Sequence, residues 1–472
     1  MKLINIPLKK DWNRPLVKLL LLSLLNFSCE KFVDIKTNSS QDFIETVRDC
    51  QLVLDDYTSM NTGYPSDGEA SADDYYLTDV SYLLTALSNT DRDLYTWSAG
   101  AIRPLALPQW QTPYKIVYNA NLVLEKVEEL RGSTDQATLD GLRGASLFFR
   151  AYSFWQVAQL YAQPYTSSNL QSPGIPLRLK SDINEISDRG TLEQTYSRII
   201  QDLQEAVGLL APTSTISSRP NKAAAYAMLA RVYLSMEDYS QALTYAGLAL
   251  QLNNQLLDYN TISQSAAVPF NPRFNKEVIF HSVMSPNPGL NPAAAGSNVA
   301  KIDPVLVASY TITDLRGLLY IKANTGTHAG SFRFTGNYEP VSNANLFNGL
   351  AVDEMLLIRA ECYARAGNNV GAMADLNTLL RTRWVTGTYT NMTATTADEA
   401  LGKILIERRK ELLMRGLRWT DLRRLNHESR FAKTLSRTIG GTVYTLPPND
   451  LRYTLLIPDE VILNAGITQN AR

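Results

Sequence analysis

The feature that most constrains the fold is a helical hairpin pattern that occurs twice in the chain. In residues 226–250, apolar and small side chains recur at the i, i+3, i+4 and i+7 spacing of one helix face. A polar break at 238–239 separates this stretch from a second helical pattern. Residues 356–379 repeat the arrangement, with a Gly-Asn turn at 367–368. The pattern predicts two pairs of antiparallel helices.

The small and apolar residues of the two copies agree in register, with Leu379 in the place of Ala249. They stand at positions 230, 242 and 249 in the first copy and at 360, 372 and 379 in the second, so both intervals are the same. This is the spacing of tetratricopeptide (TPR) repeats, in which each hairpin buries its apolar face against the next. Further amphipathic segments at 110–130, 139–161 and 191–210 fit the same architecture, with Thr191 as a capping residue. We therefore predict an all-α fold of TPR-like helical hairpin repeats.

A long segment between the two hairpins lacks helical periodicity. Residues 255–350 are rich in Pro, Gly, Asn and Ser, and short apolar runs at 278–283 and 332–334 are typical of small strands. A loop-rich insert of this length is more often functional than idle. The expected organisation is a lipoprotein signal peptide, an N-terminal helical repeat region, the loop-rich insert, and a C-terminal region with the last repeat, over residues 1–28, 29–254, 255–350 and 351–472.

The N-terminus has the layout of an export signal. Four basic residues between positions 9 and 18 precede an apolar run at 19–25, which is too short to span a bilayer as a helix. Cys29 follows, at the position where bacterial lipoproteins are cleaved and acylated. Asn26 and Phe27 depart from the usual lipobox, which leaves an ordinary secreted protein as the alternative. We predict that Cys29 is a lipid anchor.

Charge and cysteine content exclude some classes of protein. With Lys+Arg 45 against Asp+Glu 46, the chain has no basic footprint for nucleic acid. Seven basic residues and two glutamates gather at 407–424, and we interpret them as a solvated helix face in which Glu411 and Arg415 pair and Gly416 stops the helix. Cys362 falls on an apolar helix face, where a lone cysteine acts as a small buried hydrophobe, so no disulfide framework is expected.

No catalytic or metal-binding motif stands out. The three histidines are scattered, and neither Gly-x-Ser-x-Gly nor a phosphate-binding Gly-Lys-Ser/Thr loop is present. Asn89, Asp91 and Asp93 alternate as in a calcium loop but lack its Gly and distal Glu, so we expect a turn with solvated acids. We predict that the chain is not an enzyme and has no cofactor, with an incidental calcium ion left open.

Ligand-binding residues are sought among aromatic side chains that lie beside polar ones, since sugar rings stack on aromatic faces while their hydroxyl groups need hydrogen-bond partners. Two loop-like stretches, 60–103 and the insert, have this composition. Ordinary core packing is the alternative for each residue. The candidates are Tyr75, Tyr76, Trp97, Asp73, Asp74 and Arg92, followed by Tyr310, Tyr320 and Tyr338.

Several motifs resemble those of the SusD/RagB family of lipoproteins. They are CEKFVD at 29–34, WQTPYKIVYNAN at 110–121, DEMLLIRAE at 353–361 and GLRWTDLRR at 416–424, and the resemblance runs in order along essentially the whole chain. It implies TPR helices that support a variable, loop-rich ligand face.

The resemblance also implies a surface lipoprotein of the outer membrane that hands a glycan to a SusC-like, TonB-dependent transporter. The alternatives are a peptide-binding, RagB-like member, a protein-interaction scaffold without a small ligand, and a hydrolase.

Overall fold

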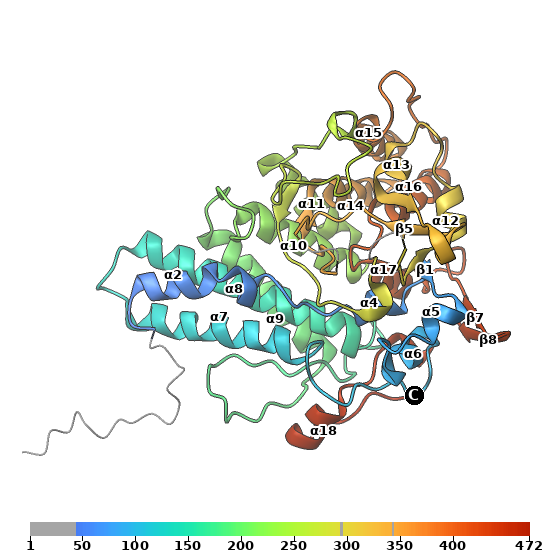
Figure 1. Cartoon of the computed structure of the whole chain (residues 1–472). Coiled ribbons are helices and arrows are strands. Elements are labelled where there is room, and N and C mark those ends of the chain that lie inside the picture. Colours follow the sequence, from blue (N-terminus) through green and yellow to red (C-terminus); the bar gives the residue numbers. More distant parts are fainter. Residues whose placement is uncertain (1–43, 293–295, 342–343) are drawn as a thin grey trace, which may run out of the picture. The chain divides into compact units, whose positions relative to one another are not determined.

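The structure, a computed structural model, describes residues 44–292, 296–341 and 344–472. The predicted signal peptide and Cys29 lie outside the described residues. Helices dominate this part of the chain (Figure 1), which confirms the predicted all-α class with TPR-like hairpins. None of the helices in the described ranges combines the length and the hydropathy needed to cross a membrane.

Three long helices form the first part of the frame, and they are α7 (Gln111–Glu129), α8 (Gln136–Tyr161) and α9 (Leu192–Leu209). Helix α8 packs against both α7 and α9, and α2 (Val47–Asp55) packs against α7 and α8 (Figure 1). Asp135 caps α8, and Thr191 caps α9 as predicted, because their side chains accept backbone N–H groups of the first helical turn.

The two predicted hairpins are confirmed. The first consists of α10 (Lys222–Ser235) and α11 (Tyr239–Leu252), and the second of α14 (Val352–Arg365) and α15 (Asn369–Arg381). The alanines at 230, 242, 249, 360 and 372 are fully buried, as expected where small side chains let two helices pack closely. Helix α11 packs against α14, and α16 (Ala397–Glu411) packs against α14 and α15. The hairpins therefore stack as TPR repeats do.

Shorter elements connect and cover this frame. The short helices are α3 (Tyr57–Met60), α4 (Asp67–Ser71), α5 (Asp79–Tyr82), α6 (Asn89–Tyr95), α12 (Pro304–Ala308), α13 (Leu315–Tyr320), α17 (Arg418–Leu425) and α18 (Asp459–Ala465). Single 3-10 turns are η3 (Tyr259–Thr261), η4 (Pro288–Leu290), η5 (Gly326–His328) and η6 (Leu451–Tyr453).

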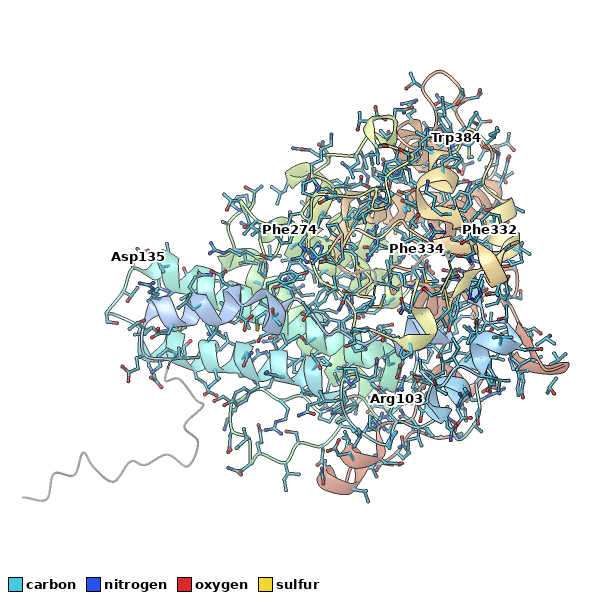
Figure 2. All side chains as sticks on the ribbon, viewed as in Figure 1. Arg103, Asp135, Phe274, Phe332, Phe334 and Trp384 are labelled. Carbon is cyan, nitrogen blue, oxygen red and sulfur yellow. The ribbon has the colours of Figure 1, made fainter. Side chains whose placement is uncertain are left out.

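Every strand in the described part of the chain belongs to a two-stranded antiparallel sheet. The pairs are β1 (Tyr75–Tyr76) with β3 (Lys301–Ile302), β2 (Val278–Phe280) with β6 (Leu350–Ala351), β4 (Ile321–Ala323) with β5 (Phe332–Phe334), and β7 (Leu435–Ile439) with β8 (Thr442–Leu446). The strands predicted at 278–283 and 332–334 are confirmed by β2 and β5, and Figure 2 shows Phe332 and Phe334 among the side chains of the insert. Pairing of β1 with β3 joins the N-terminal region to the insert.

The charged segment 407–424 is buried, so the predicted solvated helix face is wrong. Glu407, Lys410, Glu411 and Arg415 are each 4% exposed or less. Each of these four charges has a partner from a distant segment, which the sequence pattern does not reveal. Helix α16 ends at Glu411, and the backbone of Gly416 has a positive φ in the link to α17 rather than at the helix end.

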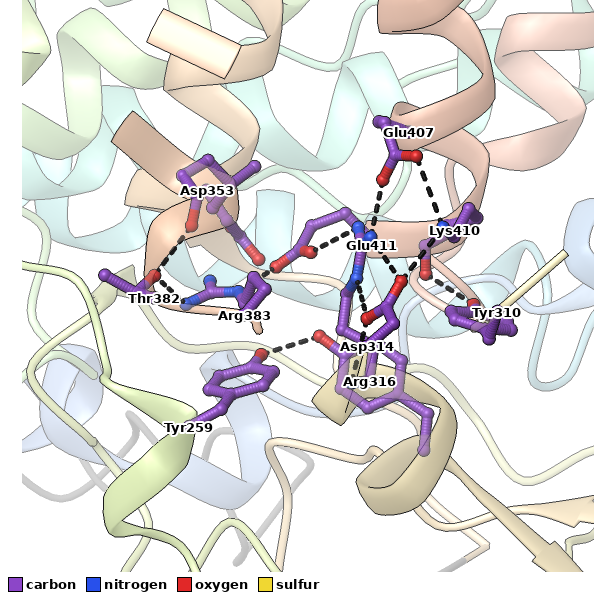
Figure 3. Close-up of polar contacts among 12 residues, drawn as sticks. Tyr259, Tyr310, Asp314, Arg316, Asp353, Thr382, Arg383, Glu407, Lys410 and Glu411 are labelled. Carbon is purple, nitrogen blue, oxygen red and sulfur yellow. Dashed lines mark hydrogen bonds and ion pairs between the residues drawn. The ribbon is translucent and has the colours of Figure 1, made fainter. Parts of the chain in front are cut away.

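This network ties the insert to the helical frame (Figure 3). Arg316 of α13 pairs with Glu407 and Glu411 of α16 at 2.5 and 3.1 Å, and Arg383 pairs with the same Glu411 at 2.7 Å. Glu411 therefore bonds two arginines from other segments, whereas the predicted partner Arg415 pairs with Asp353 at 3.3 Å. Such pairs fix geometry, because removal of one partner leaves a buried charge uncompensated.

Candidate functional site

One pocket brings together three segments that are far apart in the sequence. Its volume is about 460 Å³, and it is lined by residues of the segment 73–97, the segment 303–305 and the segment 433–438. Pairing of β1 with β3 sets the first two segments side by side, and β7 supplies the third. We call this hollow the aromatic pocket, after Tyr75, Tyr76, Tyr95 and Trp97, which line it.

Arg437 of β7 forms the centre of the pocket wall. Its guanidinium carbon lies 3.8 Å from the ring centre of Tyr95, 4.5 Å from Trp97 and 5.3 Å from Tyr75. Its amino groups donate hydrogen bonds to the backbone carbonyl oxygens of Tyr95 and Ala72. The three rings are buried, with at most 4% exposed, so they hold the arginine in place and offer little open face to a ligand. Tyr76 is only half-buried, and its ring is the one that a ligand can reach.

The rim of the pocket carries both hydrogen-bond donors and acceptors. Asp73 pairs with Arg418 at 2.6 Å and with the half-exposed Lys433 at 2.8 Å, while Arg409 joins Asp303 at 3.1 Å. Although burial opposes it, the positive charges of Arg418, Arg409 and Lys433 hold the pKa of Asp73 well below its usual value. Asp73 is therefore an ionised acceptor at neutral pH. Exposed hydroxyl groups complete the rim, and they belong to Thr434, Ser436 and Thr438.

The structure brings four of the predicted ligand residues together in this pocket, and they are Asp73, Tyr75, Tyr76 and Trp97. Asp74 lies just behind the rim, where it pairs with Arg409 at 2.8 Å. Arg92 is not part of the pocket, because its guanidinium donates to the carbonyl oxygens of Tyr82 and Leu84.

The predicted tyrosines of the insert need correction. Tyr320 and Tyr338 are 1% and 0% exposed, and both hydroxyl groups hydrogen-bond to the hydroxyl of Tyr259, at 2.6 and 2.9 Å. They pack the core of the insert, so a ligand from solvent has no access to their rings. Tyr310 donates a hydrogen bond to the carbonyl oxygen of Lys410 at 2.8 Å and does not line the aromatic pocket. We therefore drop Tyr320 and Tyr338 from the candidates, whereas Tyr310, which is partly exposed, stays a prediction outside the aromatic pocket.

The set of Asn89, Asp91 and Asp93 also differs from the prediction, because it forms part of helix α6 instead of a turn. Side chains two residues apart on a helix point in different directions, so the three cannot converge on one ion. Asp91 instead completes a capping box with Ser88 and pairs with Arg103 at 2.9 Å. Figure 2 marks the position of Arg103, which also binds Asp67 of α4 at 2.6 Å.

Three buried carboxyl groups elsewhere have the spacing of a metal site. Oxygen atoms of Glu277, Asp353 and Glu411 lie within 4.8 Å of one another. Arg383 donates to Glu411, as Figure 3 shows, and to Glu277, and Arg415 donates to Asp353, so guanidinium groups already supply the positive charge. Burial, together with the nearby carboxylates and against the opposing charge of Arg383, raises the pKa of Glu277 to about 8. The charges of the three carboxyl groups are thus neutralised by the two arginines and by a proton.

A second and larger hollow lies along α7. This α7 groove has a volume of about 630 Å³ and is lined by residues of α7, of the segment 176–187 and of α18. Trp110, Tyr114 and Tyr118 line it on the α7 side. Two exposed aliphatic side chains, Ile183 and Ile186, stand on the opposite side, together with the charged Arg178, Lys180 and Glu185.

Sequence reasoning missed Arg437, Tyr95 and Lys433, although it located the segment 73–97. Tyr95 lies within the aromatic stretch 60–103, and nothing in the sequence distinguishes it from the tyrosines chosen there. Leu435 and Ile439 alternate with Ser436 and Thr438, which is the signal of a strand and would have placed Arg437 on the same face as the two apolar residues. Nothing local indicates which rings that arginine meets.

Comparison with known proteins gives two family matches. A SusD-like family described as "starch-binding associating with outer membrane" matches residues 31–234, and the SusD family matches residues 353–455. Together they span more than half of the chain.

Among curated proteins, SusD-like protein P38 of Formosa agariphila is 24% identical over 251 residues, which are 50% of this chain and 45% of that protein. SusD-like protein P2 of the same organism is 28% identical over 134 residues, 28% of this chain and 25% of that protein. The matched part thus spans less than half the length of either relative.

Solved structures share the fold over most of the chain. A SusD superfamily protein from Bacteroides thetaiotaomicron is 21% identical with a TM-score of 0.73, and the match covers 90% of this chain and 100% of that one. A protein from Bacteroides vulgatus described as a putative sugar binding protein is 22% identical with a TM-score of 0.71, and the match covers 91% and 99%.

Proposed function

The chain belongs to the SusD/RagB family, and from this premise we propose that it binds a glycan nutrient in the aromatic pocket and delivers it to a SusC-like, TonB-dependent transporter. The proposal includes the position of the protein on the outer-membrane surface, tethered by an acylated Cys29. The description of one matched family as starch-binding and of one structural neighbour as a putative sugar binding protein supports a carbohydrate ligand.

The observation that carries the proposal is the mixture of groups around the aromatic pocket. The reachable ring of Tyr76 can stack on the C–H face of a sugar, while the ionised Asp73, the Lys433 ammonium and the nearby hydroxyl groups can accept from and donate to its hydroxyls. The α7 groove also carries aromatic rings and the charged side chains of Lys115, Lys180 and Glu185, so the control variant of the titration below is placed there.

The same chemistry argues for binding without turnover. A glycosidase needs one carboxyl group that stays protonated as general acid and a second that is ionised. Asp73 has a lowered pKa and is ion-paired, so it cannot serve as that acid. We infer that the pocket retains its ligand unchanged.

Calorimetric titration of the purified chain with pools of oligosaccharides and, separately, of peptides tests the ligand class. We expect binding of at least one glycan pool, and about tenfold weaker binding for Tyr76→Ala, equivalent to ~1.4 kcal/mol. Tyr118→Ala in the α7 groove is the matched control and should bind like the unchanged chain. Binding of peptides alone would replace the glycan by the RagB-like alternative. Loss of glycan binding in Tyr118→Ala but not in Tyr76→Ala would move the site to the α7 groove.

The proposed transporter partner needs a separate experiment. Affinity isolation of the lipidated chain from gently solubilised outer membranes should recover a TonB-dependent barrel in stoichiometric amount. Recovery of the chain without any barrel would leave the delivery step unsupported, while the ligand titration would still decide the binding step.

A further inference from the structure

A hollow at one end of the first hairpin is not used by the proposed function. Because α10 and α11 are antiparallel, the start of α10 and the end of α11 lie together, and β2 begins beside them. The hollow between these ends is lined by residues of the segments 213–223, 252–255 and 274–279 and has a volume of about 330 Å³. We call it the hairpin pocket. It shares no lining residue with the aromatic pocket or the α7 groove.

Uncharged polar groups dominate the wall of the hairpin pocket. Five amide and three hydroxyl side chains line it, and they belong to Asn221, Asn253, Asn254, Gln255, Asn275, Thr213, Ser214 and Ser217. Amides and hydroxyls each donate and accept hydrogen bonds, which is what the hydroxyl groups of a sugar require. Lys276 is the one charged residue among the described residues of the lining, and none of them carries a carboxylate that would select a cation.

Three of these polar side chains can be reached from the solvent. Thr213, Asn254 and Gln255 are exposed, and their side chains form no hydrogen bond with any residue in the described ranges. Asn221 differs, because it is buried and caps α10 by accepting the amide of Ala224 at 2.9 Å. The three exposed groups can therefore give their hydrogen bonds to a ligand that enters the pocket.

An aromatic ring completes the wall. Phe274 is partly exposed, and its backbone has a φ of 63°, which is an outlier for a bulky side chain. Its ring makes T-shaped contacts with His281 and Tyr57, with ring centres 5.1 and 6.2 Å apart, and Figure 2 marks its position. The contacts hold the ring while part of it stays open to solvent. Strain of this kind clusters at ligand sites, and here it sets a ring beside unpaired amides.

We propose that the hairpin pocket is a second glycan site, which binds one uncharged sugar unit. The C–H face of the sugar lies on the ring of Phe274, and its hydroxyl groups bond to Thr213, Asn254 and Gln255. The volume is at the lower end of the range for ligand pockets and suits a mono- or disaccharide unit. This inference rests on the proposed function, because it takes glycans as the ligands of the chain.

Ligand-observed NMR with maltose, cellobiose and galactobiose tests the site. Tyr76→Ala serves as the background, so that the aromatic pocket contributes little. At least one of the three disaccharides should bind to this background. Addition of Gln255→Ala or of Phe274→Leu should weaken that binding at least about fivefold, because a hydrogen-bonding amide or the flat stacking face is lost. Gln251→Ala, at an exposed glutamine of α11 outside the pocket, is the matched control and should bind like the background.

Folding of the variants is checked by their urea midpoints. Gln255 is exposed, so Gln255→Ala should unfold at the same midpoint as the background, whereas Phe274→Leu keeps an apolar side chain against His281 and Tyr57.

The outcomes separate this site from the aromatic pocket. Binding that survives both Gln255→Ala and Phe274→Leu would overturn the second site. So would a disaccharide that binds the unchanged chain but not Tyr76→Ala, and the aromatic pocket would then stand alone. If Tyr76→Ala binds as well as the unchanged chain and Phe274→Leu does not, the hairpin pocket holds and the aromatic pocket fails.

Discussion

The guanidinium of Arg437 lies 3.8 Å from the centre of the Tyr95 ring, and a hydrogen bond to the carbonyl oxygen of the same tyrosine reinforces the contact. These residues come from opposite ends of the chain, so their contact closes the aromatic pocket between the N-terminal segment and the β7–β8 hairpin. In Figure 1, β7 and β8 in red lie next to α5 and α6 in blue, and the amide of Gly440 donates to Asp79 at 2.9 Å. The wall of the pocket is therefore a long-range contact rather than a local motif.

Replacement of Arg437 by Ala should destabilise the protein by about 2–4 kcal/mol, because it leaves buried carbonyl oxygens without donors and exposes three rings to a void. Arg437→Lys should recover only part of the loss, because an ammonium neither stacks on the aromatic rings nor donates two hydrogen bonds in the planar geometry of a guanidinium. Thr438→Ala, at the next and exposed position of β7, serves as control and should change the free energy of unfolding by less than about 0.5 kcal/mol. Urea unfolding followed by circular dichroism measures all three, and equal midpoints for Arg437→Ala and the unchanged chain would contradict the assignment.

Ala360 of α14 tests the close approach of helices in the second hairpin. The residue is fully buried, so Ala360→Leu should lower the free energy of unfolding by about 1–3 kcal/mol through overpacking. Val370→Leu on α15 also enlarges a side chain, at a position that is 83% exposed and has free space. A measurable loss in Val370→Leu as large as that in Ala360→Leu would speak against tight packing as the cause.

The helical frame could be predicted because its signals are local. Side chains at 226–250 and 356–379 repeat every three or four positions, and Thr191 stands directly before an apolar run, so periodicity and capping fix where helices begin and how they pair. The short strands β2 and β5 followed from apolar runs between turn residues in the same way. Each of these inferences needs only a window of a few residues.

The same reasoning from a short window of sequence cannot predict whether a charged residue is buried. Glu411 was expected to be solvated because Arg415 stands four positions further on, at the spacing of a pair on one helix face, whereas its actual partners are Arg316 and Arg383. A window of one helix contains no information about a partner that lies 95 residues away. Tyr320 and Tyr338 were misjudged for a related reason, since an aromatic residue in an unpatterned segment can face the solvent or build a core of its own. The ligand site shares this limit, because long-range contacts build the aromatic pocket.

Removal of the proposed acylation site should release the protein from membranes. Cys29→Ala expressed in a bacterium that processes lipoproteins should move from the membrane pellet to the soluble fraction, because the sulfur is the only point of lipid attachment proposed. Cys50→Ala is a suitable control, since this buried cysteine has no role in anchoring. Membrane partition that is unchanged in Cys29→Ala would remove the lipid anchor from the proposed function without touching ligand binding.

Glu69 should make stability fall as pH rises through the neutral range. The residue is 2% exposed, its Oε2 accepts the amide of Gly416 at 3.0 Å, and burial together with the charge of Asp74 raises its pKa from 4.5 to about 8. The folded protein therefore holds a proton that the unfolded chain releases above about pH 4.5. The stabilisation is complete below that pH and is lost as the pH rises towards 8.

Glu69→Gln should remove this dependence, because an amide keeps an acceptor for Gly416 and does not titrate. Urea unfolding at pH 5, 6, 7 and 8 should give a smaller decline in the free energy of unfolding for Glu69→Gln than for the unchanged chain, with a residual slope from Glu277, whose pKa is also raised to about 8. Glu399→Gln is the matched control, since hydrogen bonds from Lys403 and Thr395 lower the pKa of this exposed carboxyl to about 2, so that its titration falls outside the tested range. Parallel stability curves for Glu69→Gln and the unchanged chain would mean that Glu69 is ionised in the folded protein, and the charge balance around Asp74 and Arg418 would then have to include one more negative charge.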